Sequence, residues 1–168
     1  MKQKIIIHIT YIILSIILYS CDMGLAPKEP TKKSYISGEI SYKGGKDKWP
    51  PADSVLEIRL VAFKNYPLSD SSSILRELTD GNAYFTLDTL PRFVDKANYF
   101  LEINDPPVLL KYIAVAQRYG NLFQWRVIGI YSESGDNLKP SSVMVNPGDS
   151  LKNINIEVDF QNLPPQPF

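Results

Sequence analysis

The residues that decide the fold lie near the C-terminal end, where positions 153–160 read NINIEVDF. Apolar residues occupy the even positions of this stretch, and asparagine, glutamate or aspartate occupies every odd position. A period of two residues predicts a β-strand with one buried and one solvated face. Burial of each apolar side chain stabilises the fold by about 1.5 to 3 kcal/mol. Because a slip of one residue would exchange the two faces, the pairing register is expected to be fixed.

The same period recurs earlier in the chain. Residues 56–62 place Leu56, Ile58, Leu60 and Ala62 on one face and Val61 on the exposed side. Residues 99–103 alternate in the same way, and residues 71–78 are the one helix candidate. Further candidate strands cover residues 35–42, 83–87, 111–117, 123–131 and 141–145.

Turn-forming residues separate these strands, with glycine, proline, asparagine and aspartate at 44–45, 80–82, 105–107, 119–121, 135–137 and 146–149. Short strands at this spacing predict an all-β fold, a single immunoglobulin-like or prealbumin-like antiparallel β-sandwich of about 7–9 strands. The domain is expected over residues 34–161, which are enough to bury a single core. The prolines of residues 162–168 predict a tail that either packs along the sandwich or is offered to a partner.

The N-terminal segment has the organisation of a secretory signal. Lys2 and Lys4 provide positive charge, and residues 5–19 form an apolar run of about 15 residues, shorter than the roughly 20 that span a membrane. Residues 18–21, Leu-Tyr-Ser-Cys, resemble the lipobox of bacterial lipoproteins. The resemblance implies that residues 1–20 are removed and that Cys21 is lipidated. We therefore expect a lipid-anchored protein of the bacterial cell envelope, in the outer membrane.

Residues 21–33 are predicted to form a tether between this lipid and the domain. The segment after Cys21 is polar, contains Pro27 and Pro30, and shows no apolar periodicity. Such a chain extends by about 3.1 Å per residue, so the tether can hold the domain up to roughly 40 Å from the bilayer.

Cleavage before Cys21 also removes His8, the only histidine, and lipidation blocks the only thiol. A Ser-His-Asp or Cys-His nucleophile and a zinc site of histidine and cysteine are thereby excluded from the mature chain. The full sequence carries 18 basic and 18 acidic residues, without the clustered basic face of a nucleic-acid binder. No cofactor and no metal are predicted, since aspartate and asparagine beside glycine are ordinary turn formers.

Four segments resemble the carboxypeptidase regulatory-like, or prealbumin-like, sandwich family: residues 36–40 (ISGEI), 80–87 (DGNAYFTL), 90–91 (LP) and 99–103 (YFLEI). In that family a glycine turn leads into a strand, a Leu-Pro corner follows, and a tyrosine-containing strand returns across the other sheet. This chain differs in having a longer corner, at residues 92–96. The resemblance implies a non-catalytic module that spaces, braces or binds.

Aromatic residues mark the candidate contact surface. Tyr119, Phe123 and Trp125 surround a Gly-Asn turn, and rings beside amide and guanidinium groups suit sugar stacking or protein docking. Phe123 and Trp125 also share one face of the predicted strand, as core residues do. Trp49 is followed by prolines that exclude it from a central strand. It is either a recognition residue or a plug over an open end of the sandwich.

These patterns predict a lipid-anchored envelope protein that acts as a non-catalytic binding or structural module. Its partners would be the membrane, through the N-terminal lipid, and an envelope protein or glycan. The alternative is a carboxylate-dependent hydrolase of envelope or extracellular glycans, which needs two acids about 5 to 9.5 Å apart in a cleft. Glu57, Glu102 and Glu157 lie on predicted strands and are the acids available to such a site.

Overall fold

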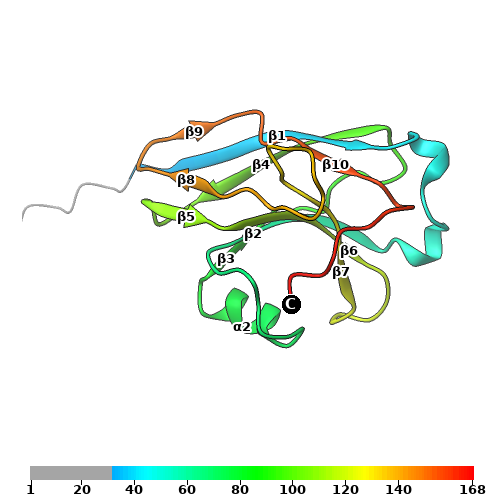
Figure 1. The fold of residues 1–168 in the computed structure, drawn as a ribbon, viewed down its shortest axis with the longest axis horizontal. Coiled ribbons are helices and arrows are strands. Elements are labelled where there is room, and N and C mark those ends of the chain that lie inside the picture. Colours follow the sequence, from blue (N-terminus) through cyan, green and yellow to red (C-terminus); the bar gives the residue numbers. More distant parts are fainter. Residues whose placement is uncertain (1–31) are drawn as a thin grey trace, which may run out of the picture. The chain divides into compact units, whose positions relative to one another are not determined.

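The computed structural model describes residues 32–168, which form a β-sandwich-like all-β fold (Figure 1). One four-stranded sheet has the order β10-β1-β4, with β9 also paired to β1, and the other has the order β3-β2-β6-β7. A two-stranded sheet pairs β5 with β8. The strands are β1 Ser34–Tyr42, β2 Glu57–Phe63, β3 Ala83–Phe85, β4 Lys96–Ile103, β5 Val108–Leu110, β6 Tyr112–Arg118, β7 Trp125–Ile130, β8 Val143–Val145, β9 Ser150–Leu151 and β10 Ile156–Val158.

The main core lies between the two four-stranded sheets, which form the upper and lower layers of Figure 1. Alternate side chains of each strand enter it, as the period of two residues predicts. Strand β4 shows this pattern clearly, because Ala97, Tyr99, Leu101 and Ile103 are buried while Lys96, Asn98 and Phe100 are exposed. The short strands β5 and β8 add Leu110 and Val145 to the same core.

A second, smaller core covers the outer face of the lower sheet. Helix α2 (Ser73–Thr79) and the loop before it pack there, with the Tyr66 ring stacked 4.6 Å from that of Tyr112. Strand β6 is therefore buried on both faces, and Val61, which we expected on an exposed side, is partly buried. The expectation for Leu56 was also wrong, since it lies exposed before β2 begins. Single-strand periodicity does not show that a helix covers the second face of a sheet.

The stretch at residues 153–160 has the predicted burial except at Phe160, which is only partly buried, and its regular strand is shorter. Ile154, Ile156 and Val158 are buried, whereas only Ile156–Val158 forms β10. The chain kinks before it, at Asn153 with φ 64°, and the Ile154 backbone crosses over Gly38. A Cβ at Gly38 would lie 2.3 Å from the Ile154 carbonyl oxygen, so only glycine fits there.

Strand directions differ from the expectation at one place in the sandwich. Both β9 and β10 run parallel to β1, with Ile36 beside Leu151 and Ile40 beside Ile156, whereas β4 is antiparallel to β1. The kink at Asn153 divides one long strand beside β1 into these two pieces. This division and β5, which directly follows a Pro-Pro pair expected to form a turn, raise the count in the described residues to ten.

The C-terminal tail packs along the lower sheet. The Gln166 side chain accepts a hydrogen bond from the Val127 N–H at 2.8 Å and donates one to the Val127 carbonyl at 3.2 Å. The Leu68 N–H donates to the Pro167 carbonyl at 2.7 Å. A side-chain amide thus pairs with β7 in the manner of a neighbouring strand, and it covers part of this outer edge of the sheet.

Candidate functional site

The turn between β6 and β7 is fixed by four hydrogen bonds among its own residues. The Tyr119 N–H donates to the Gln124 carbonyl at 3.1 Å, and the Gln124 N–H donates to the Asn121 carbonyl at 3.0 Å. The Asn121 N–H donates to Gln124 Oε1 at 2.8 Å, and Asn121 Oδ1 accepts from the Phe123 N–H at 3.0 Å. Asparagine side chains favour such turns because they bond to a backbone group two residues further on. The tip of this hairpin therefore has a defined backbone.

Apolar side chains project from this defined turn. Tyr119 is 43% exposed, Leu122 70% and Phe123 75%. Trp125 is half-buried behind them, where its indole N–H donates to the Leu122 carbonyl at 2.9 Å. The Arg126 guanidinium lies 5.5 Å from the centre of the Tyr119 ring. We call Tyr119, Leu122, Phe123 and Trp125 the hairpin tip.

The hairpin tip contains three of the four aromatic residues predicted to bind a partner. Phe123 belongs to the turn rather than to the strand, because β7 begins only at Trp125, so the two do not share a strand face. Leu122 was missed. The available signal was a second apolar residue directly before Phe123 in the turn, where burial does not require one.

Trp49 lies apart from the hairpin tip and closes one end of the main core. Its ring centre is 4.3 Å from that of Tyr42, 5.0 Å from Phe160 and 5.3 Å from Phe93. Its indole N–H donates to the Val94 carbonyl at 2.9 Å. This half-buried position agrees with the second of the two roles considered for Trp49, a plug over an open end of the sandwich. Contact between Trp49 and a partner stays a prediction.

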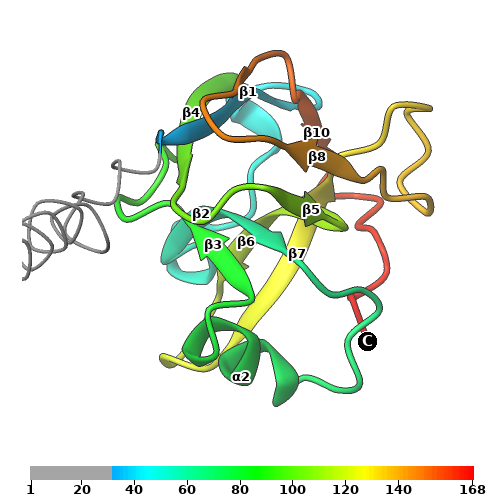
Figure 2. The same cartoon turned by 90° about the vertical axis from the view of Figure 1, so that its left-hand side faces the viewer.

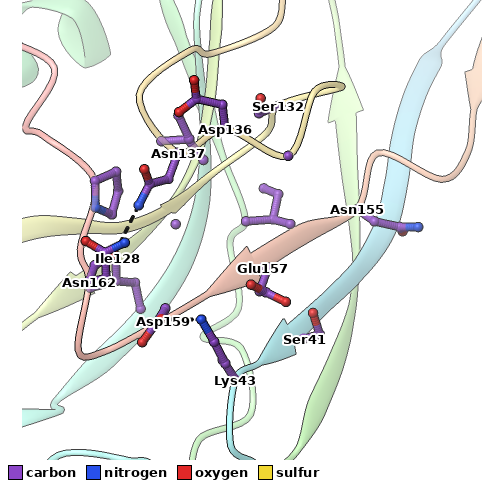
Figure 3. A pocket seen from close by; sticks show the side chains of 15 residues that line it. Ser41, Lys43, Ile128, Ser132, Asp136, Asn137, Asn155, Glu157, Asp159 and Asn162 are labelled. Atoms are coloured by element: carbon purple, nitrogen blue, oxygen red, sulfur yellow. Dashed lines mark hydrogen bonds and ion pairs between the residues drawn. The ribbon is translucent and has the colours of Figure 1, made fainter.

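A polar groove of about 490 Å³ lies where the outer strands β7 and β10 of the two sheets meet (Figure 3). The strands approach so closely at Gly129 that a Cβ there would lie 2.9 Å from the Glu157 carbonyl oxygen and 2.8 Å from the Val158 side chain. Residues 132–137 and 159–164 supply further walls. The sequence gives no signal for this groove, because it depends on how two strands about 30 residues apart are placed side by side.

The carboxyl groups of the groove with shifted pKa values favour their charged forms. A hydrogen bond from the Lys43 ammonium, 2.8 Å from Asp159, lowers the pKa of the Asp159 carboxyl. The backbone N–H of Leu138 lowers the pKa of the Asp136 carboxyl. A glycosidase requires the opposite shift for its general acid, so these two groups are better suited to holding polar or cationic groups.

The three strand glutamates considered for hydrolysis do not form one cluster. Glu57 lies on β2 of the lower sheet, whereas Glu102 and Glu157 lie on β4 and β10, with β1 between them. Partial burial raises the pKa of the Glu57 carboxyl, but hydrogen bonds from Arg59 and Arg118 outweigh this effect and hold the pKa below its usual value. This arrangement gives no pair of acids from the predicted set facing a common cleft.

Cys21, predicted to be lipidated, lies outside the described residues, as do the predicted signal peptide and most of the tether. Within residues 32–168, no three histidine, cysteine, aspartate or glutamate side chains are grouped so that they could hold a metal ion. None of the helices in that same range has the length and apolar character needed to span a bilayer.

Comparison with known proteins gives no relative from which a function could be transferred. No protein-family model matches the sequence, and no curated protein or solved structure matches it significantly.

Proposed function

We propose that this chain is a lipid-anchored lipoprotein of the bacterial cell envelope, in the outer membrane, and that it binds a partner without catalysing a reaction. The hairpin tip is the contact site. The observation that carries this proposal is the exposure of Leu122 and Phe123, 70% and 75%, on a turn whose backbone is already fixed. Rigid apolar groups bind well because little conformational entropy is lost when they are covered.

The proposed location in the cell envelope rests on the lipobox-like residues 18–21 and the apolar run before them. The finer sandwich type, prealbumin-like, belongs to the same proposal. In its favour, the turn at residues 80–82 leads directly into β3, and the YFLEI segment forms most of β4, which pairs with β1. Both placements agree with the order of elements that the resemblance implies.

The chemistry of the hairpin tip favours a protein partner over a glycan. Sugar stacking uses a flat ring with polar donors beside it, but the Trp125 indole N–H already donates to the Leu122 carbonyl. Leu122 and Phe123 instead present aliphatic and aromatic surface of the kind that fills pockets on proteins. A nearby cation, Arg126, adds a group that is enriched at such interfaces.

Photocross-linking in the native membrane tests this function. Phe123 is replaced by a photoreactive phenylalanine analogue in the full chain, and cells are irradiated. A covalent adduct of defined mass is expected, and adding Leu122→Asp should remove most of it, because loss of a central apolar contact costs about 2 kcal/mol or more.

Leu138 provides the matched control, since it is 65% exposed on a loop outside the hairpin. The photoreactive residue placed there should not give the same adduct. Identical adducts from both positions, or no adduct from position 123, would refute the hairpin tip as the contact site. An adduct whose added mass is removed by a glycan hydrolase would identify a glycan partner.

A further inference from the structure

Strand β4 is an outer strand of the upper sheet and pairs only with β1, which separates it from β10 (Figure 2). The backbone carbonyl of Asp95, directly before β4, accepts a hydrogen bond from the Tyr42 N–H, so Asp95 and Tyr42 form a hydrogen-bonded pair, and every second pair along the ladder is of the same kind. Ala97, Tyr99 and Leu101 therefore direct their backbone groups toward β1, and the residues between them direct theirs outward. Within residues 32–168, no hydrogen bond reaches the outward groups of Lys96, Asn98, Phe100 and Glu102.

This outer edge lacks the usual protection against pairing. Outer strands are commonly short, bulged, or interrupted by proline or by central charges. Strand β4 has eight residues in continuous register with β1, and its centre carries Asn98 and Phe100. Phe100 is 59% exposed, with its ring 4.6 Å from that of Tyr35. The edge is therefore suited to accept another strand.

The charges along the edge indicate which strand fits. Lys96 lies at one end and Glu102 at the other, on the same outer face of the sheet. An antiparallel copy of β4 centred on Tyr99 would place Lys96 opposite Glu102 of the second copy at both ends. The same register places Asn98 opposite Phe100. All four pairs join residues whose backbone groups point outward, as hydrogen bonding requires.

We infer that two copies of this chain associate through β4, antiparallel and centred on Tyr99, to form one continuous sheet across the pair. The contact is isologous, so each cross-strand pair occurs twice. The charges are also compatible with the existing ion pairs, Lys96–Glu39 at 2.8 Å and Lys33–Glu102 at 2.7 Å. In the dimer each Glu102 lies between Lys33 of its own chain and Lys96 of the second copy, so charges alternate across the interface.

Charge reversal tests the register. The full chain, purified in detergent, is analysed by sedimentation equilibrium at low salt. Lys96→Glu and Glu102→Lys should each weaken dimerisation by about tenfold or more, because two attractive pairs become two repulsive ones. The double variant should return to within about threefold of the wild type, since the pairs are then restored with reversed sign. Lys139→Glu, which makes the same charge change on an exposed loop, should leave the dimer unchanged.

Phe100→Pro tests the hydrogen bonds of the edge. Proline removes an N–H that points outward, so the ladder with β1 is kept while two bonds of the dimer are lost. The variant is expected to sediment as a monomer with a thermal melting curve close to that of the wild type. Leu101→Pro, which removes an N–H directed at β1, should instead unfold. A monomeric wild type, or a dimer that is insensitive to Phe100→Pro and to charge reversal, would overturn the proposal.

Discussion

At the scale of single residues, Trp49 and Tyr119 are both aromatic, but their surroundings differ. Trp49→Ala should lower the free energy of unfolding by about 3 kcal/mol, because it empties the space between Tyr42, Phe93 and Phe160. Tyr119→Ala should cost about 1 kcal/mol or less, since the side chain is exposed and loses a surface cation-π contact with Arg126. Urea titrations of the two variants measure this difference. Equal losses would mean that the two environments are not as described.

The sequence could identify these aromatic residues as unusual but could not separate their roles. The rings around Trp49 come from positions 42, 93 and 160, which are brought together only by the closing of the sandwich. The hairpin residues, in contrast, are neighbours along the chain, so their grouping was predictable from the turn at residues 119–121. Leu122 shows the limit of that approach, because turn composition alone does not report which side chains remain uncovered.

At the scale of elements, β10 and the residue before it offer a matched pair of substitutions. Ile156→Asp places a carboxylate in the main core without a partner, which costs several kcal/mol and should prevent folding. Asn155→Asp should change stability by about 0.5 kcal/mol or less, because a carboxylate can still accept the hydrogen bond from the Glu39 N–H. Circular dichroism and urea titration compare the two. A folded Ile156→Asp protein would contradict the burial assigned to this strand.

Strand positions were largely predictable because each strand carries its own period of two residues. Residues 35–42 and 111–117 were expected as strands and form most of β1 and β6. Partners and directions were not predictable: β9 and β10 both run parallel to β1, and a kink at Asn153 with a close crossing at Gly38 separates them. Both are tertiary features, and the pattern of residues along a single strand carries no information about them.

At the scale of the whole domain, the two proposed contact surfaces belong to different sheets of the sandwich. The hairpin tip joins β6 to β7 of the lower sheet, whereas β4 is an outer strand of the upper sheet. The proposed pairing through β4 uses no residue of either hairpin tip. A dimer could present two of them at once, and linked sites bind a repetitive partner more tightly than either site alone.

Retention at the membrane is the prediction that concerns the chain as a whole. Buried acyl chains contribute about 0.8 kcal/mol per methylene, and stable anchoring takes two chains or more. Wild-type cells grown with labelled palmitate should yield a labelled protein in the membrane fraction, whereas Cys21→Ala should be unlabelled and soluble. Ser15→Ala, which changes the apolar run but keeps residues 18–21, should remain labelled. Label on the Cys21→Ala protein would refute lipidation at this cysteine, and the proposed location in the cell envelope would then lose its main support.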